Sequence, residues 1–313
     1  MIKFTAAISL LFASYGNVEA FTPTSLSFAS KGVNTGVQWV NNDKTKLMCG
    51  LVAAIDDLWS YDGAYPDVPL LNNNEKDEEN IILSTTTDIL YHRGPDGMTC
   101  SSGTIGSTKA RWSLGHTRLA IVDPNNRFAD QPFQLDFTVD GVKKNVKVAA
   151  NGEIYNHEKI YSDMKGDGWD HDRISGSDCE VIAHSFAKYG GPATAAKLDG
   201  MFAFVIFEES EDGSVKAFAA RDPVGIKPLY YGKSLKTTEK DDASAYLFSS
   251  ELKGLVGHVD PESVVAIPPG HYWTPEEGLV CYYNPDWLRK VRSMSFRIRS
   301  QRLLFLMPFS TSG

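Results

Sequence analysis

Hydrophobic residues along the chain gather in short runs that indicate strands. The runs are rich in aliphatic or aromatic residues and are bounded by Gly, Pro, Asn or Asp, which interrupt strands. They span Leu51–Ile55, Arg118–Val122, Val146–Ala150, Phe202–Phe207, Val215–Ala219 and Ala245–Phe248. Most of these lengths suit an antiparallel sheet.

Two other segments have the pattern of helices. Ile81–Tyr91 has apolar residues at helical spacing and is followed by a glycine stop at Gly94. Glu180–Tyr189 is a second helix, with Asp178 as its cap and Gly190 after its last residue. Because the strands are clustered with few helices between them, the pattern predicts an α+β fold.

The beginning of the chain has a different composition. In residues 1–20, Lys3 precedes the apolar run Phe4–Ala13, and Val18 and Ala20 form a small-residue cleavage pattern. These features are typical of a cleavable signal peptide, and the run is too short to span a bilayer. We therefore expect no membrane segment in the mature protein.

Residues 21–48 are rich in Ser and Thr and poor in acidic residues, as transit peptides are. With the signal peptide, they resemble the two-part presequence of proteins imported into plastids enclosed by additional membranes, which predicts a plastid location. The alternative is a disordered leader or translation that starts at Met48, which would leave the protein in the cytoplasm. Residues 56–80 form a polar insertion that suits a solvated loop.

Charge and cysteine content narrow the function. The formal net charge is -8 and the isoelectric point is about 5.4, which argues against nucleic acid or anionic lipid as a partner and favours a small-molecule substrate. The cysteines are widely spaced, with no C-x-x-C pair, so neither a metal site nor a disulfide framework is indicated. They are Cys49, Cys100, Cys179 and Cys281.

The tripeptide Met48-Cys49-Gly50 offers a nucleophile. If cleavage leaves Cys49 as the first residue, its own α-amine, with an ordinary pKa near 8, can activate its thiol. Taken alone, the tripeptide is common, and a small cysteine buried in a strand is the simpler interpretation.

Five motifs that follow Cys49 favour its interpretation as a nucleophile. They are Arg93-Gly94-Pro95-Asp96-Gly97, the run Gly115–Asp123 (GHTRLAIVD), Asn151–Asn156 (NGEIYN), Ser175–Glu180 (SGSDCE) and Arg221–Tyr230 (RDPVGIKPLY). With these motifs in this order, the chain resembles the class II glutamine amidotransferases, and specifically the glutaminase half of the glutamine-dependent asparagine synthetases. The resemblance implies an N-terminal nucleophile fold, a four-layer αββα sandwich with two stacked antiparallel sheets.

The resemblance also implies a role for each site residue. Cys49 is the nucleophile, and the Asn151 amide and the Gly152 N–H stabilise the oxyanion, presented by a tight turn at the end of a strand. Arg118 binds the α-carboxylate of glutamine through two parallel hydrogen bonds, and Asp178 receives its α-ammonium group. Further substrate contacts come from Leu119, Ile121, Val122 and Glu153.

Other motif residues are interpreted as structural. Arg93 and Asp96 would brace the turn near the nucleophile, while Arg221, Asp222 and Lys227 would form a polar cluster between strands. Without the resemblance, Asn151-Gly152 would be a hairpin turn, Arg118 an edge-strand arginine and Asp178 a helix cap.

The implied reaction is hydrolysis of L-glutamine to L-glutamate and ammonia for asparagine biosynthesis, without a metal or cofactor. ATP and Mg²⁺ would be needed only by a synthetase domain, whose Ser-Gly-Gly-x-Asp-Ser loop is not in this sequence. We place the glutaminase domain at 49–285 and interpret 286–313 as a basic tail at the truncated junction to that domain. The expected partner is an ammonia-accepting synthetase domain or subunit. A catalytically silent glutaminase-like subunit, or the amidotransferase of another class II enzyme, is the alternative.

Overall fold

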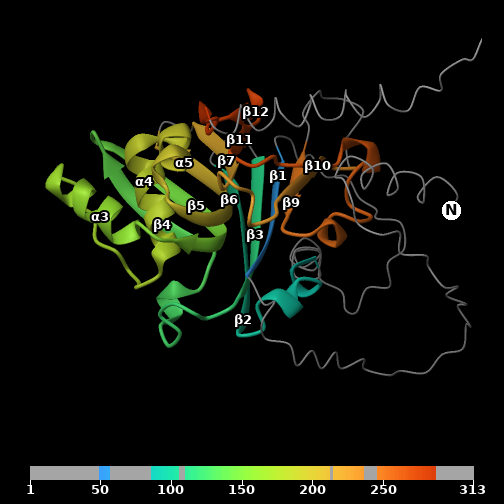
Figure 1. Ribbon diagram of the computed structural model, residues 1–313, viewed down its shortest axis with the longest axis horizontal. Coiled ribbons are helices and arrows are strands. Elements are labelled where there is room, and N and C mark those ends of the chain that lie inside the picture. The colour runs from blue at the N-terminus through green and yellow to red at the C-terminus, as the bar shows by residue number, and fades with distance from the viewer. Residues whose placement is uncertain (1–48, 57–85, 106–109, 212–213, 236–244, 287–313) are drawn as a thin grey trace, which may run out of the picture. The chain divides into compact units, whose positions relative to one another are not determined.

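Two six-stranded sheets form the framework of the protein (Figure 1). The computed structural model describes residues 49–56, 86–105, 110–211, 214–235 and 245–286. All of these residues lie within one unit of the chain, residues 42–313. Every pairing between neighbouring strands in the two sheets is antiparallel.

The first sheet begins directly after the candidate nucleophile, Cys49. Its central strand is β1 (Gly50–Asp56), which follows Cys49 directly and pairs with a strand on each side. The strand order is β10 (Val265–Ala266), β8 (Tyr230–Lys233), β9 (Tyr246–Ser249), β1, β3 (Ala110–Arg118) and β2 (Gly97–Ile105).

The second sheet contains the longest strand, β5 (Val142–Ile154), with 13 residues. β5 lies between β4 (Phe133–Val139) and β6 (Gly200–Ser210). The order continues from β6 through β7 (Val215–Arg221) and β11 (His271–Thr274) to β12 (Gly278–Cys281).

The two sheets pack face to face through one hydrophobic core. Leu51 and Ala53 of β1 join Leu114 of β3 on one side, and Ala149 of β5 and Val205 of β6 on the other. Alternate residues of each strand point into this layer, as the period of a strand requires. The buried start of β1 is thereby fixed against β5, which brings the ends of these two strands together.

Three helices cover the outer face of the second sheet, as Figure 1 shows. They are α3 (His157–Gly166), α4 (Val181–Tyr189) and α5 (Gly191–Lys197). This second core is more aromatic and includes Phe186 of α4, Phe204 of β6 and Phe218 of β7. Burying large rings on this face supplies much of the apolar area that stabilises a domain.

The outer face of the first sheet is also covered by helical segments. Leu90 packs on Val52 of β1 and lies between a helical stretch at 86–88 and the 3-10 helix η2 (Tyr91–Arg93). The α+β class and the two stacked antiparallel sheets with helices on both outer sides are therefore confirmed. Short 3-10 helices complete the described chain: η3 (Arg127–Ala129), η4 (Asp178–Glu180), η5 (Leu252–Gly254) and η6 (Pro261–Ser263).

Five of the six predicted strands are present, as β1, β5, β6, β7 and β9. The prediction for Arg118–Val122 is wrong, because β3 ends at Arg118. Beyond it, the Leu119 N–H points to the Cys49 sulfur and the Ala120 N–H to the Asp96 carboxylate instead of a neighbouring strand. Side chains have replaced the ladder partners at this point.

The helix predictions are confirmed in part. α4 occupies the second predicted segment and ends at Tyr189, and Gly190 follows as its C-cap with a φ of 80° that suits glycine. Only the end of Ile81–Tyr91 is described; residues 86–88 are helical there, and Tyr91 begins η2. No helix among the described residues is long and apolar enough to span a membrane. The presequence, most of the polar insertion at 56–80 and all of the basic tail except Asp286 lie outside the described residues.

Candidate active site

One pocket of about 230 Å³ brings all nine predicted site residues together. It lies where the start of β1, the end of β3 and the end of β5 meet η4. Its lining includes Cys49, Arg118, Leu119, Ile121, Val122, Asn151, Gly152, Glu153 and Asp178. Residues that were not predicted as site residues also line it: His116, Ala129, Gln131, Ser177, Cys179, Met201 and Lys227.

Cys49 is held at the entrance to β1 by contacts with two neighbouring segments. Its Sγ accepts a hydrogen bond from the Leu119 N–H at 3.3 Å, and its carbonyl oxygen accepts one from Arg93 Nε at 3.1 Å. Arg93 also forms an ion pair with Glu251 at 2.7 Å. Burial raises the pKa of the Cys49 thiol, while the Leu119 N–H and the charge of Lys227 act in the opposite direction.

Asn151 and Gly152 lie inside β5, opposite Ala203 and Phe202 of β6, so the expected turn is wrong. A Cβ on Gly152 would come within 2.4 Å of the Met201 carbonyl oxygen, which explains the glycine as a close approach of two strands. Asn151 is fully buried, and neither Nδ2 nor Oδ1 has a hydrogen-bond partner among the described residues. Such an amide in a pocket wall is free to bond a ligand.

Arg118 is positioned by the loop that follows β3. Its Nη1 donates to Asp130 Oδ1 at 2.6 Å and to the Asn126 carbonyl at 3.3 Å. Its Nη2 donates to the carbonyls of Val122 at 3.1 Å and Asp123 at 2.7 Å. Both terminal nitrogens therefore already have protein acceptors, and a two-bond grip on a carboxylate would require Arg118 to exchange some of them.

Asp178 does not cap α4, and that interpretation is corrected. Its Oδ2 accepts a hydrogen bond from the Ile154 N–H at the end of β5, at 2.6 Å, and neither η4 nor α4 has a side-chain cap. The carboxylate thereby ties η4 to the strand that carries Asn151. Burial and the charge of Asp178 raise the pKa of Glu153, which lies beside it in the pocket.

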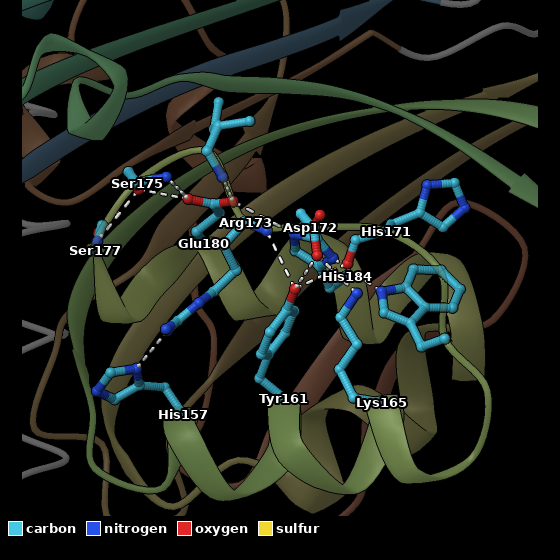
Figure 2. A network of polar contacts seen from close by, with 12 residues as sticks. His157, Tyr161, Lys165, His171, Asp172, Arg173, Ser175, Ser177, Glu180 and His184 are labelled. Carbon is cyan, nitrogen blue, oxygen red and sulfur yellow. Dashed lines mark hydrogen bonds and ion pairs between the residues drawn. The ribbon is translucent and has the colours of Figure 1, made fainter.

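A buried polar network holds the loop that leads into Asp178 (Figure 2). Glu180 is fully buried and accepts hydrogen bonds from the Ile174 N–H at 2.7 Å, from the Ser175 N–H at 2.8 Å and from the Ser175 hydroxyl. His184 Nε2 lies 3.3 Å from the same carboxylate, and Trp169 Nε1 donates to His184 Nδ1 at 3.0 Å. Because Nδ1 accepts, Nε2 carries the proton and donates to Glu180.

His116 forms part of the pocket wall and is buried. Its Nε2 donates to the Ala150 carbonyl at 3.1 Å, whereas Nδ1 has no partner among the described residues. Burial lowers the pKa of His116 to about 4, and the nearby Arg118 charge acts in the same direction. The imidazole is therefore neutral near pH 7.

Lys227 was interpreted as a member of a polar cluster between strands, but its side chain lines the pocket and is only 5 % exposed. The neighbouring Arg221 and Asp222 do form such a cluster, and it fixes the loop before β8. The Asp222 carboxylate accepts the Lys227 N–H at 3.0 Å, and Arg221 Nε donates to the Lys227 carbonyl at 2.7 Å. The sequence showed a lysine inside a motif rich in Gly and Pro. A linear pattern does not tell which way the side chain of that lysine points.

Among the described residues, no group of three or more His, Cys, Asp or Glu side chains is placed to hold a metal ion. The chemistry available to the pocket is that of its thiol, its amide and backbone donors, and its charged side chains. A half-buried cysteine at a strand end, in the same pocket as an unpaired amide, suits attack on a carbonyl carbon whose oxygen becomes negatively charged.

The chain is similar to proteins of known family. A family model described as a glutamine amidotransferase domain matches residues 69–271. A glutamine-hydrolysing asparagine synthetase of Zea mays is 40% identical over 234 residues, which are 70% of this chain and 34% of that protein. Asparagine synthetase 3 of Arabidopsis thaliana, also glutamine-hydrolysing, is 35% identical over 78% of this chain and 34% of its own length.

A solved structure with the same fold is the glutamine phosphoribosylpyrophosphate amidotransferase of B. subtilis, complexed with ADP and GMP. Its TM-score is 0.53 at 20% identity, over 76% of this chain and 50% of that chain. The fold and the pocket with its strand-end cysteine define a class II amidotransferase of the N-terminal nucleophile type. The chain belongs to the glutamine amidotransferase domain family. It spans about a third of the length of the curated relatives described above.

Proposed function

We propose that this domain hydrolyses L-glutamine to L-glutamate and ammonia, with Cys49 as the nucleophile. The observation that carries the proposal is the meeting of the Cys49 thiol with the fully buried, unpartnered Asn151 amide in one pocket. Gly152 lines the same pocket and would add its N–H as a second oxyanion donor.

The reaction would proceed in two steps. The Cys49 thiolate attacks the side-chain amide carbon of glutamine, and the proton from the thiol passes through the α-amine of Cys49 to the leaving nitrogen, which departs as ammonia. Water then adds to the resulting thioester carbon, glutamate is released, and the thiol regains its proton. The α-amine serves as base and acid, so we propose that cleavage between Met48 and Cys49 precedes activity. Removal of a plastid presequence at this bond would free the amine.

Glutamine would be recognised through its α-ammonium group and its α-carboxylate. The negative side of the pocket, Asp178 with Glu153, suits the α-ammonium group, and Arg118 suits the α-carboxylate. Leu119, Ile121 and Val122 line the pocket beside Arg118 and would contribute backbone and apolar contacts. The ammonia would pass to an acceptor domain or subunit of the asparagine synthetase type, in which case ATP and Mg²⁺ act there and not in this domain.

Glutamate release from glutamine tests the proposal. The chain that begins at Cys49 is compared with the same chain extended at its N-terminus and with Cys49→Ala. We expect full turnover only in the first. The rate should fall by at least about 10³-fold in Cys49→Ala and by about 10² to 10⁴-fold in the extended form, which lacks the free amine. Glutamine binding without turnover by the form that begins at Cys49 would support the silent-subunit alternative instead.

A further inference from the structure

We propose that Lys227 is the cation that holds the Cys49 nucleophile in its reactive form. This inference rests on the proposed function and adds a positioning residue to it, because Lys227 acts through Cys49. Lys227 is a buried residue whose ammonium has no counter-ion among the described residues. Lys227 is 5 % exposed, and the hydrogen bonds that it makes within the described residues involve its backbone.

Three cations lie around Cys49. Two of them are paired with a carboxylate, and Lys227 is the third. Arg93 is paired with Glu251 at 2.7 Å, and Arg118 with Asp130 at 2.6 Å. Among the described residues, Lys227 has no carboxylate at ion-pair distance. A buried ammonium without a partner is costly, so its charge is available to whatever anion forms in the pocket.

The loop around Lys227 is built to keep this charge in place. The Asp222 carboxylate is fully buried and accepts the N–H groups of Val224, Gly225 and Ile226 as well as that of Lys227. Arg221 donates to the carbonyl oxygens of this loop and of Ile267. With its backbone bonded on both sides, the Cα of Lys227 is fixed beside the pocket that the residue lines.

The electrostatics of the pocket agree with this arrangement. Burial lowers the pKa of Lys227, and the charges of Cys49 and Glu153 oppose that shift. The charge of Lys227 in turn lowers the pKa of the Cys49 thiol. An ammonium beside Cys49 would also disfavour protonation of its α-amine, because like charges repel. Both effects increase the fraction of enzyme with a neutral amine or a thiolate near pH 7.

The titratable and charged groups around Lys227 belong to each element that forms the pocket. They are Cys49 before β1, Arg93 of η2, His116 and Arg118 of β3, Glu153 of β5, and Asp178 and Cys179 of η4.

The test measures the rate at which iodoacetamide alkylates Cys49 as a function of pH, in the chain from Cys49 to Gly313. Peptide mass identifies the alkylated cysteine. In Lys227→Met, we expect the midpoint of this profile to move upward by about one pH unit, with alkylation about tenfold slower below the midpoint, because an opposite charge is lost. Lys227→Arg keeps the charge and should keep the midpoint. If Lys227→Met does not fold, Lys227→Gln takes its place.

Lys147 provides the matched control. It is also 5 % exposed, but it is paired with Glu209 at 3.6 Å and does not line the pocket. Lys147→Met should leave the midpoint unchanged. A midpoint in Lys227→Met equal to that of the parent chain, or an equal shift in Lys227→Arg, would overturn the inference.

The same variants separate this inference from the proposed function. Alkylation needs no turnover, so its profile decides the role of Lys227 even if the parent chain releases no glutamate. If the parent chain is active, the pH profile of kcat/KM should shift upward in Lys227→Met together with the alkylation profile. A raised KM with both profiles in place would mean that Lys227 only contacts glutamine, which contradicts the inference.

Discussion

Two buried polar regions lie on either side of Asp178, and they differ in how their hydrogen bonds are satisfied. The loop anchor consists of Trp169, Ile174, Ser175, Glu180 and His184, in which both carboxylate oxygens of Glu180 and both ring nitrogens of His184 have partners (Figure 2). The pocket wall consists of His116, Asn151 and Lys227. There, Nδ1 of His116 and both polar side-chain atoms of Asn151 have no partner among the described residues.

This difference distinguishes residues that stabilise the fold from residues that take part in the reaction. An unsatisfied buried polar group costs about 1–3 kcal/mol, and where such a group lines a pocket, a ligand can complete its bonds. A satisfied network instead fixes the conformation of the chain around it. The loop anchor should therefore determine stability and the position of Asp178, and the pocket wall should determine the reaction.

Removing the carboxylate of the loop anchor should have the largest effect. Glu180→Ala leaves the Ile174 and Ser175 N–H groups and His184 without their buried acceptor. We expect a loss of roughly 3–5 kcal/mol in the free energy of unfolding, measured by chemical denaturation.

Ser185→Ala, in α4 directly after Glu180 and η4, is the control, because the buried Ser185 hydroxyl has no partner among the described residues. It should change the free energy of unfolding by less than about 1 kcal/mol. Equal losses in the two variants would contradict the division between satisfied and unsatisfied groups.

Asn151→Ala should show the opposite behaviour. We expect kcat for glutamine hydrolysis to fall by about 10²–10³-fold, as on removal of an oxyanion donor, while the free energy of unfolding stays the same or rises. The buried amide that is removed makes no hydrogen bond within the described residues. Steady-state kinetics and denaturation of the same preparation give both values. A clear loss of stability with unchanged kcat would mean that Asn151 stabilises the fold and takes no part in the reaction.

His116 should make stability depend on pH. Its pKa falls from 6.5 to about 4 in the folded chain, so between these values the unfolded chain binds a proton that the folded chain does not. The contribution of His116 to the free energy of unfolding is therefore complete above pH 6.5. It is lost as the pH falls toward 4, by about 3 kcal/mol in total.

The comparison is with His116→Gln, whose amide can donate to the Ala150 carbonyl as His116 Nε2 does. Denaturation from pH 7 to pH 4 should give a steeper loss in the parent chain than in the variant. Parallel curves would mean that His116 binds a proton equally well in both states.

The sequence predicted the parts of the fold that depend on local pattern. The run Phe202–Phe207 in β6 is continuous in apolar residues, and the run Val146–Ala150 in β5 is interrupted only by Lys147. Such runs are easy to recognise, and they arise because both faces of this sheet are covered. β2 was missed because Gly97–Ile105 is rich in Gly, Ser and Thr. β4 was also missed, although Phe133, Leu135 and Phe137 alternate with exposed residues, a signal that a stricter search for period two would have found.

The site was predictable as a set of residues but not as a geometry. All nine residues meet in one pocket because the motifs lie at strand ends that the two stacked sheets bring together. The Asp178 contact with Ile154 and the bonds between Arg118 and the loop after β3 join residues by tertiary packing, which no linear pattern contains. The direction of the Lys227 side chain depends in the same way on Arg221 and Asp222.

Covalent trapping tests whether Cys49 is the nucleophile of a glutamine-hydrolysing site. The protein purified from its own cells is incubated with a glutamine analogue that carries an electrophilic carbon at the side-chain amide, and its peptides are analysed by mass. We predict one adduct, on Cys49 as the first residue of the chain, and protection by excess glutamine. No adduct, or an adduct on Cys100, Cys179 or Cys281 instead, would contradict the assignment.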